Sequence, residues 1–314
     1  MKLRNSLIAV AVATAVAAPL TAMADASMYG SVRLSVRGID AGDDMKWNIA
    51  NHSSRLGFKG SEELDNGLKA VAHYELGVNA DQAIFATGAS ANRLSYVGLE
   101  GGFGGVYLGA QWTPFYTVVG GTTDQFNAVG ANHIHSTVRT GDALAYAGTF
   151  GPATIIGAVV MTDMNETETD EIDIFQLGAQ FNAGPVAVGI AVDQRAESAG
   201  DGTRFGLGAT YSAGEMTFAA EFTSSEATLE GGTEDDDDVT GFEIYGGFGL
   251  GNGNLIHASF GQTDDGNNTP NSISLGYQKK LSKATRFWVE GMIDDPDTDA
   301  DDTTTVSIGM RHDW

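Results

Sequence analysis

Apolar and polar residues alternate along most of the chain from residue 25 onwards. Segments of about 8–12 residues carry an apolar or aromatic side chain at every second position, with small or polar side chains between them. In the last segment Val306, Ile308 and Met310 fall on one face, and Ser307 and Arg311 fall on the other. A period of two residues is typical of β-strands whose two faces meet different surroundings. About sixteen segments follow this pattern, and bacterial single-chain membrane barrels have an even number of strands.

The connections between these segments alternate in length. The short ones consist of residues that favour tight turns, at 65–67, 101–104, 151–152, 184–185, 213–214 and 251–253. The others are longer and polar, and three of them contain acidic runs, at 163–173, 226–238 and 294–302. Short turns at one rim and long loops at the other are typical of outer-membrane barrels. The pattern therefore predicts an all-β fold, a closed antiparallel transmembrane β-barrel of about 16 strands.

A secreted β-sandwich or β-helix is the alternative, because a soluble sheet with one buried face shows the same alternation. A sandwich rarely needs so many evenly spaced strands, and it would bury the apolar rows in a core. A membrane barrel would instead turn those rows towards lipid and would have to close on itself, since unpaired backbone groups cost several kcal/mol there.

One long connection stands apart from the others. Residues 92–100 and 105–112 alternate on either side of a glycine-rich turn and predict a β-hairpin. Residues 113–137 then show no period of 2 or 3.6, and loops of that length in a compact fold are usually functional. The next alternating segment opens with Arg139. We expect this loop to fold into the barrel and narrow its lumen, with arginines on the wall that faces it.

The N-terminus has the features of a secretory signal peptide. Lys2 and Arg4 give a positively charged start, residues 7–18 are apolar, and Ala22-Met23-Ala24 offers a small-x-small cleavage site. A spanning helix needs roughly 20 apolar residues, so an uncleaved anchor is the weaker alternative. We expect a signal peptide at 1–24 and a barrel domain at 25–314.

Composition limits the chemistry. The chain has 41 acidic and 17 basic residues and a net charge of −24, which argues against a nucleic-acid partner because phosphates need a basic face. It has no cysteine, which excludes disulfides and thiolate metal sites. The three acidic runs hold 19 of the 41 acidic residues and are candidates for weak Ca²⁺ or Mg²⁺ binding, with solvated loops as the alternative. We expect no other cofactor and no defined metal site.

Four motifs in the first half of the chain are more specific than the alternation. They are SRLGFKGSEEL at 54–64, NGLKA at 66–70, RLSYVGL at 93–99, and GFG followed by VYLG at 102–109. These motifs resemble the general bacterial porins, the trimeric outer-membrane channels of Gram-negative bacteria. The last strand ends in Trp314, where that family usually has phenylalanine as part of its insertion signal.

The resemblance implies a sixteen-stranded barrel in the outer membrane of a Gram-negative bacterium. It implies a homotrimer that contacts outer-membrane lipid and lipopolysaccharide, and a C-terminal strand read by the barrel-assembly machinery. It also implies that the third external loop, loop 3, folds into the lumen as a constriction through which small hydrophilic solutes and ions pass.

The same resemblance implies that acids on loop 3 face a ladder of basic residues on the wall. Arg55, Arg93 and Arg139 match the family's wall positions, and Arg33 lies on the same face of the first strand as a family lysine position. Asp124 is the one acid on the loop before Arg139. We expect these five residues to line the constriction, and we place Arg37 nearer the mouth of the lumen.

The expected function is therefore passive diffusion through a general porin, without catalysis. A solute-specific channel of the same fold is the alternative, and a barrel enzyme or a secreted binding protein is a third possibility. No G-x-S-x-G nucleophile motif sets a catalytic serine apart. The sign of ion selectivity stays open: the acidic loops favour cations and the arginines favour anions. Because the acidic excess is large, we weakly favour selectivity for cations.

Overall fold

The computed structural model describes residues 25–42, 44–82, 84–86, 88, 91–130, 133–134, 136–161, 172–231 and 237–314. The expected signal peptide, 1–24, lies outside these residues. The strands are β1 (Asp25–Asp40), β2 (Lys46–Asn51), β3 (Arg55–Glu63), β4 (Lys69–Asn79), β5 (Ile84–Phe85), β6 (Asn92–Gly101), β7 (Gly104–Trp112), β8 (Arg139–Thr140), β9 (Ala143–Phe150), β10 (Ala153–Val160), β11 (Ile174–Ala183), β12 (Val186–Arg195), β13 (Gly202–Ala213), β14 (Met216–Ser225), β15 (Val239–Gly251), β16 (Asn254–Asp264), β17 (Asn271–Lys280), β18 (Thr285–Asp295) and β19 (Thr303–Asp313).

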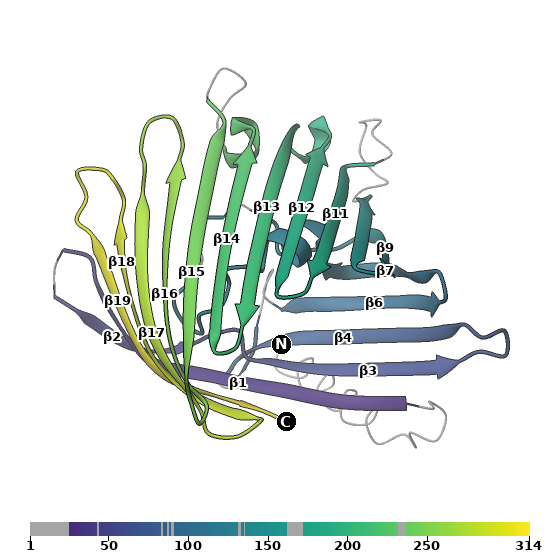
Figure 1. The fold of residues 1–314 in the computed structure, drawn as a ribbon, viewed down its shortest axis with the longest axis horizontal. Helices are drawn as coiled ribbons and strands as arrows, with labels where there is room; N and C mark the ends of the chain where they lie inside the picture. The colour runs from purple at the N-terminus through teal and green to yellow at the C-terminus, as the bar shows by residue number, and fades with distance from the viewer. Residues whose placement is uncertain are drawn as a thin grey trace, which may run out of the picture.

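Antiparallel pairing runs around the whole sheet and closes it, because β1 pairs with β19 (Figure 1). At this seam the backbones of Gly30 and Trp314 exchange two hydrogen bonds of 3.2 and 3.1 Å. β2 and β3 form one interrupted strand that pairs with β1, and β8 and β9 form another that pairs with β7. With the two-residue β5 set aside, the described residues build a closed barrel of sixteen strands, as the alternation predicted.

Apolar side chains cover the outside of this barrel, and polar side chains point into it. In β17, Ile273 and Leu275 are 57% and 66% exposed, whereas Ser272 and Ser274 are 5% and 1% exposed. A soluble sheet packs its apolar face into a core and shows the opposite arrangement. The outer surface is therefore suited to lipid, and the secreted β-sandwich is excluded.

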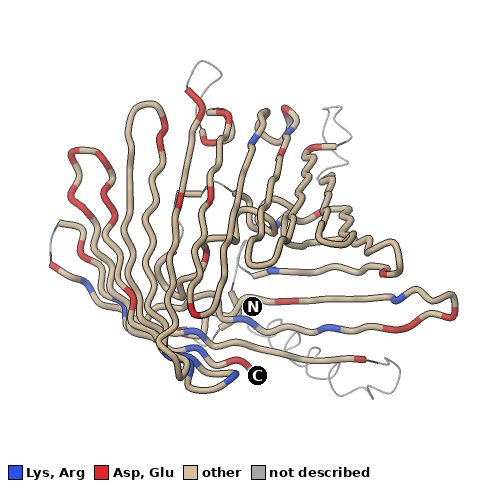
Figure 2. The backbone as a smooth tube through the Cα atoms, in the orientation of Figure 1, with Lys and Arg blue, Asp and Glu red and all other residues tan. Residues whose placement is uncertain are grey.

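The two ends of the barrel differ, as the connections predicted. All the short turns lie at one end, here called the turn end, and several contain a glycine with positive φ, at Gly67, Gly151, Gly184, Gly214 and Gly253. The longer connections lie at the other end, here called the loop end, where acidic residues gather (Figure 2). No helix in the described part of the chain combines the length and hydropathy needed to span a bilayer.

The described residues of loop 3, within 113–137, lie on the lumen side of the wall against β11–β18. The loop contains one π-helical turn, η3 (Tyr116–Gly120), which the absence of any periodicity did not predict. Phe115, Val118 and Val119 are almost fully buried and pack with Ala191 of β12. This small apolar cluster sits on the lumen side of the wall, so the loop is packed and does not simply hang in water.

Two glycines show why the loop can lie so close to the wall. A Cβ atom at Gly189 of β12 would overlap the carbonyl oxygen of Val118, and one at Gly241 of β15 would overlap that of His133. Glycine is the residue that allows such a backbone-to-backbone approach. The inward row of the wall is thus shaped for loop 3 by residues without side chains.

Candidate functional site

A cluster of arginines around one glutamate lies on the wall of β3, β4 and β6. Arg93 donates its Nε–H to Oε1 of Glu75 at 2.6 Å, and Nη1 of Arg55 lies 3.5 Å from the same oxygen. Tyr29 of β1 donates its hydroxyl to Oε2 at 2.6 Å. Glu75 is 4% exposed, so its charge is directed at these partners and not at the lumen. One carboxylate shared by two guanidinium groups leaves this part of the wall positive.

An aromatic pair joins Arg139 to loop 3. The guanidinium of Arg139 lies over the indole of Trp112, 5.1 Å from the ring centroid, and that of Arg93 lies 6.0 Å away. The ring of Tyr116 stacks on the same indole, with centroids 5.1 Å apart and an angle of 16°. Stacking of this kind holds a guanidinium in a defined position without removing its charge.

Tyr116 in turn holds the acid of loop 3. Its hydroxyl donates to Oδ2 of Asp124 at 2.6 Å. Burial, and then the Asp124 carboxylate, raise the pKa of Tyr116 well above its usual range, so the phenol stays a donor. Asp124 is therefore placed through Tyr116, and no contact between Asp124 and a wall arginine occurs among the described residues.

Arg33 belongs to a second basic group, at the seam of the barrel. It lies directly opposite Arg311 of β19, which lies opposite Arg286 of β18, and all three alternate with outward apolar residues. Its Nε donates to Oγ of Ser31 at 3.1 Å, and Asp313 accepts from Arg311 at 2.7 Å. Sequence analysis named only Arg33 of this group.

A cavity of about 380 Å³ opens on the loop-end side of the arginines. Its charged lining residues are Arg37, Arg93, Arg139 and Asp81, and most of the others are polar or small, such as Asn48 and Gln82. Arg37 lies four residues beyond Arg33 along β1, towards the loop end, and its position at the mouth of the lumen stays a prediction.

Two buried glutamates on the opposite wall hold loop 3 in place. Glu221 of β14 accepts hydrogen bonds from the backbone N–H groups of Thr122 and Thr123, at 2.6 and 3.2 Å. Glu290 of β18 accepts from the backbone N–H groups of Asn127 and Ala128, at 2.9 and 2.7 Å. Carboxylates that accept several backbone N–H groups make strong, directional anchors. The loop is fixed at two separate points.

Sequence analysis missed Glu75, Glu221 and Glu290. Each is an acid at an inward position of its strand, and the residues next to it along the strand are mainly apolar or small, as in MTFAAEFTSS around Glu221. A charge alone in such a row needs a partner when it is buried. That pattern is the signal that could have identified all three.

No group of three or more His, Cys, Asp or Glu residues in the described part of the chain is arranged to hold a metal ion. Of the three acidic runs considered for weak Ca²⁺ or Mg²⁺ binding, residues 162–171 and 232–236 lie outside the described residues.

A family model described as Gram-negative porin matches residues 9–314 of this chain. The chain belongs to the Gram-negative porin family. This membership confirms the resemblance stated from the motifs, and it places the porin in the outer membrane of a Gram-negative bacterium.

The curated relatives match the porin over only part of their length. The major outer membrane protein P.IB of Neisseria gonorrhoeae is 37% identical over 121 residues, which are 36% of this chain and 33% of the relative. The P.IB protein of Neisseria lactamica is 37% identical over 117 residues, 34% of this chain and 33% of the relative. These matches span about a third of the length of each relative.

Solved structures resemble the porin over nearly its whole length. The anion-selective porin from Comamonas acidovorans has a TM-score of 0.76 at 20% identity, covering 92% of this chain and 99% of that one. A trimer form of OmpT from Vibrio cholerae has a TM-score of 0.69 at 15% identity, covering 92% and 99%. At such identities the likeness establishes the fold.

Proposed function

We propose that the porin is a passive diffusion channel for ions and small hydrophilic solutes and that it catalyses no reaction. The observation that carries this proposal is the closed barrel with lipid-facing apolar rows and a polar lumen narrowed by loop 3. The loop end faces the cell exterior and the turn end faces the periplasm, as in outer-membrane barrels generally.

The proposal extends to processing and assembly. Residues 1–24 are removed as a signal peptide, and the C-terminal strand ending in Trp314 is recognised by the barrel-assembly machinery. The mature chain assembles as a homotrimer that contacts lipid and lipopolysaccharide. The trimer form of the OmpT neighbour supports this assembly.

The constriction consists of Arg55, Arg93, Arg139 and Arg33 on the wall and Asp124 on loop 3. Arg55 and Arg93 share Glu75, and Asp124 is held by Tyr116, so the four arginines outnumber the two acids. Arginine keeps its charge at every accessible pH. Fixed positive charges beside a narrow water-filled path lower the energy of a passing anion.

This arrangement favours the passage of anions. The excess of acidic residues in the sequence had suggested a preference for cations instead. Many of those acids lie in loops at the rim, where salt screens their field beyond about 8 Å. The acids of the far wall lie beneath loop 3: Glu221, Glu243 and Glu290 are at most 3% exposed. The charges that a permeating ion meets at close range are therefore mostly the arginines.

Conductance in planar bilayers tests the proposal. The refolded porin should show ohmic steps, with a zero-current potential in a salt gradient of the sign for anion preference. The substitution Arg139→Gln should move that potential towards cations. Lys283→Gln, in the exposed turn between β17 and β18, removes the same charge far from the constriction and should leave it unchanged. Absence of conductance would refute the channel, and equal potentials for both variants would refute the constriction.

A further inference from the structure

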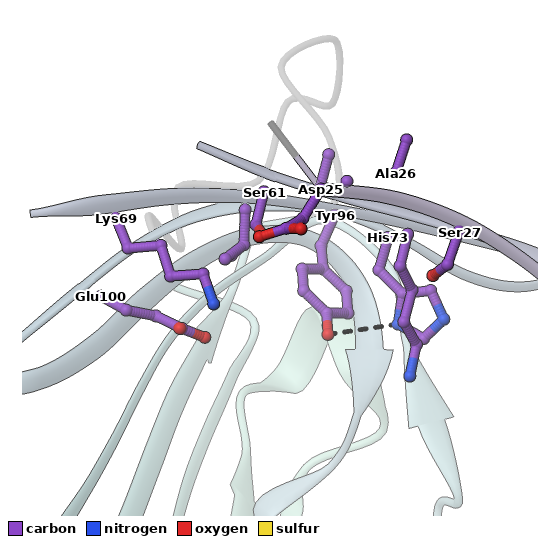
Figure 3. Close-up of a pocket in the computed structure, with 12 residues that line it drawn as sticks. Asp25, Ala26, Ser27, Ser61, Lys69, His73, Tyr96 and Glu100 are labelled. Carbon is purple, nitrogen blue, oxygen red and sulfur yellow. Dashed lines mark hydrogen bonds between the residues drawn. The ribbon is translucent and has the colours of Figure 1, made fainter. Parts of the chain in front are cut away.

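A second cavity, of about 610 Å³, lies in the lumen at the turn end, below the constriction. It is formed by the inward faces of β1, β3, β4 and β6 (Figure 3). Its charged lining residues are Lys59, Lys69, Asp25 and Glu100, and His73 and Tyr96 also line it. A solute that has passed the arginines reaches this cavity before it leaves the barrel.

Charges of both signs in this cavity lack a partner of opposite sign. Lys69 and Glu100 lie directly opposite each other on β4 and β6, and both side chains point into the cavity in Figure 3. Within the described part of the chain, however, neither Lys59 nor Lys69 has a carboxylate oxygen within 4.0 Å. Directly opposite residues of an antiparallel pair have Cβ atoms only about 5 Å apart, so an ion pair between them would be within reach.

Tyr107 explains why Lys69 and Glu100 stay apart. Its hydroxyl donates to Oε1 of Glu100 at 3.0 Å from the neighbouring strand β7. This bond holds one carboxylate oxygen of Glu100 on the β7 side. The result is an ammonium group and a carboxylate that face the same space without neutralising each other.

A chain of hydrogen bonds fixes the side chains on the other side of the cavity. Tyr29 donates to Glu75, so it must accept from Nε2–H of His73, which lies 2.7 Å away. In the neutral ring Nδ1 then accepts from the hydroxyl of Tyr96, at 3.2 Å (Figure 3). This leaves the oxygen of Tyr96 free to accept from a ligand. Lys59 lies over the ring of Tyr29, 5.2 Å from its centroid, which keeps its ammonium at this side.

We propose that this cavity is a binding subsite for small zwitterions that carry an ammonium and a carboxylate on the same carbon, the arrangement of an α-amino acid. The solute carboxylate lies at Lys69 and the solute ammonium lies at Glu100 and the oxygen of Tyr96. A simple anion is attracted by the ammonium of Lys69 but repelled by the carboxylate of Glu100. A simple cation is attracted by Glu100 but repelled by Lys69. Only a zwitterion satisfies both. This subsite rests on the proposed function, because its ligands arrive through the channel.

Glycine, acetate and methylammonium are matched probes, because each of the two ions carries only one of the charges of glycine. Each is added to single channels of the full-length refolded porin, and the concentration that reduces the current by half is measured. Glycine should act at lower concentration than either ion. Lys69→Gln and Glu100→Gln should each raise the half-blocking concentration of glycine about three- to fivefold, as expected for the loss of one solvent-accessible charge contact. Glu100→Gln should not raise the half-blocking concentration of acetate.

The double variant K69E/E100K supplies a rescue. It keeps both charges and exchanges their places, so a zwitterion can bind in the reverse orientation and the effect of glycine should return. Tyr107→Phe removes the hydroxyl that holds Glu100, so Glu100 can pair with Lys69. Block of the current by glycine should then become weaker although no charge has been removed. Lys283→Gln serves as the matched charge control, and heat-modifiable migration on gels reports folding of each variant.

Several results would overturn the subsite. Equal action of glycine on wild type and on Glu100→Gln would show that the carboxylate is not a ligand. Weakening by Lys69→Gln of acetate and glycine alike, with no effect of Glu100→Gln, would show a plain anion site. A porin that conducts but does not respond to glycine refutes the subsite and leaves the channel standing, whereas a porin that does not conduct refutes the channel itself.

Discussion

Charged residues in two regions of the lumen wall are placed differently with respect to loop 3. In the region from β1 to β8, Arg93 and Arg139 line a cavity, and the buried acid Glu75 is shared by Arg55 and Arg93. From β11 to β18 the wall carries Glu221, Glu243 and Glu290, and loop 3 lies over them. Loop 3 covers these acids and leaves Arg93 and Arg139 beside a cavity. In the proposed channel, selectivity therefore depends on which charges the loop leaves uncovered, and net charge does not reveal it.

The largest effect should follow from cutting an anchor of loop 3. Glu290→Ala leaves the backbone N–H groups of Asn127 and Ala128 without their acceptor, at a cost of about 1–3 kcal/mol for each. We expect the loop to detach on the β18 side, so the open-channel current should become larger and noisier and the anion preference should fall.

Glu63→Ala is the matched control for that variant, because Glu63 is an exposed glutamate at the turn end of β3. It should leave conductance and noise unchanged. Wild-type current in the Glu290→Ala channel would mean that the hydrogen bonds to Glu290 do not hold the loop.

A smaller effect is expected from the aromatic pair. Trp112→Ala removes the ring that both Arg139 and Tyr116 contact, and each of these contacts is worth about 0.5–1 kcal/mol. Arg139 keeps its charge but loses its fixed position. Single-channel recordings should show a wider channel with only slightly reduced anion preference.

Trp47→Ala, which removes a lipid-facing indole that is 58% exposed, is the control and should not alter the permeability ratio. If Trp112→Ala lowered the anion preference as strongly as Arg139→Gln, the stacking would be setting the charge at the constriction and not just its position.

The smallest effect concerns a link between two loops at the loop end. The carboxylate of Asp297 accepts from the backbone N–H of Thr269 at 2.6 Å and from its hydroxyl at 2.9 Å. These bonds hold the pKa of Asp297 below its ordinary value. A lowered pKa means that the link is fully present above the ordinary value and is lost as the pH falls through the lowered one.

Amide hydrogen exchange at Thr269, corrected for the intrinsic effect of pH, should therefore report protection at pH 5 that disappears in stronger acid. Asp297→Ala should abolish this protection already at pH 5, and Asp299→Ala, two residues further along the same loop, should not. Protection of Thr269 that persists in the Asp297→Ala variant would assign it to another partner.

The barrel was predictable from the sequence because its signal is local. Two-residue alternation in each strand, together with turn residues between strands, predicts each strand and each hairpin separately. The hairpin of β6 and β7 was predicted within one residue at each end. The strand after loop 3 was predicted as continuous, but it is interrupted at Gly141 and Asp142, between β8 and β9.

The site was only partly predictable, because its contacts join distant parts of the chain. The motifs drew attention to the arginines as candidates. They did not reveal that the partner of Arg93 is Glu75, or that Glu290 accepts from residues more than 160 positions away. The path of loop 3 depends on glycines such as Gly189, which sequence analysis did not distinguish from other small strand residues. No local pattern encodes which inward residue a loop will cover.

The most direct test of this account compares one charge from each half of the wall in the same assay. The zero-current potential in a salt gradient is measured for wild type, for Arg93→Gln at the cavity of the proposed constriction, and for Glu243→Gln on the wall that loop 3 covers, where the side chain is 2% exposed. The account predicts a shift towards cations for Arg93→Gln and no shift for Glu243→Gln. Equal and opposite shifts in the two variants would contradict it, because they would show that loop 3 leaves both walls open to the permeating ion.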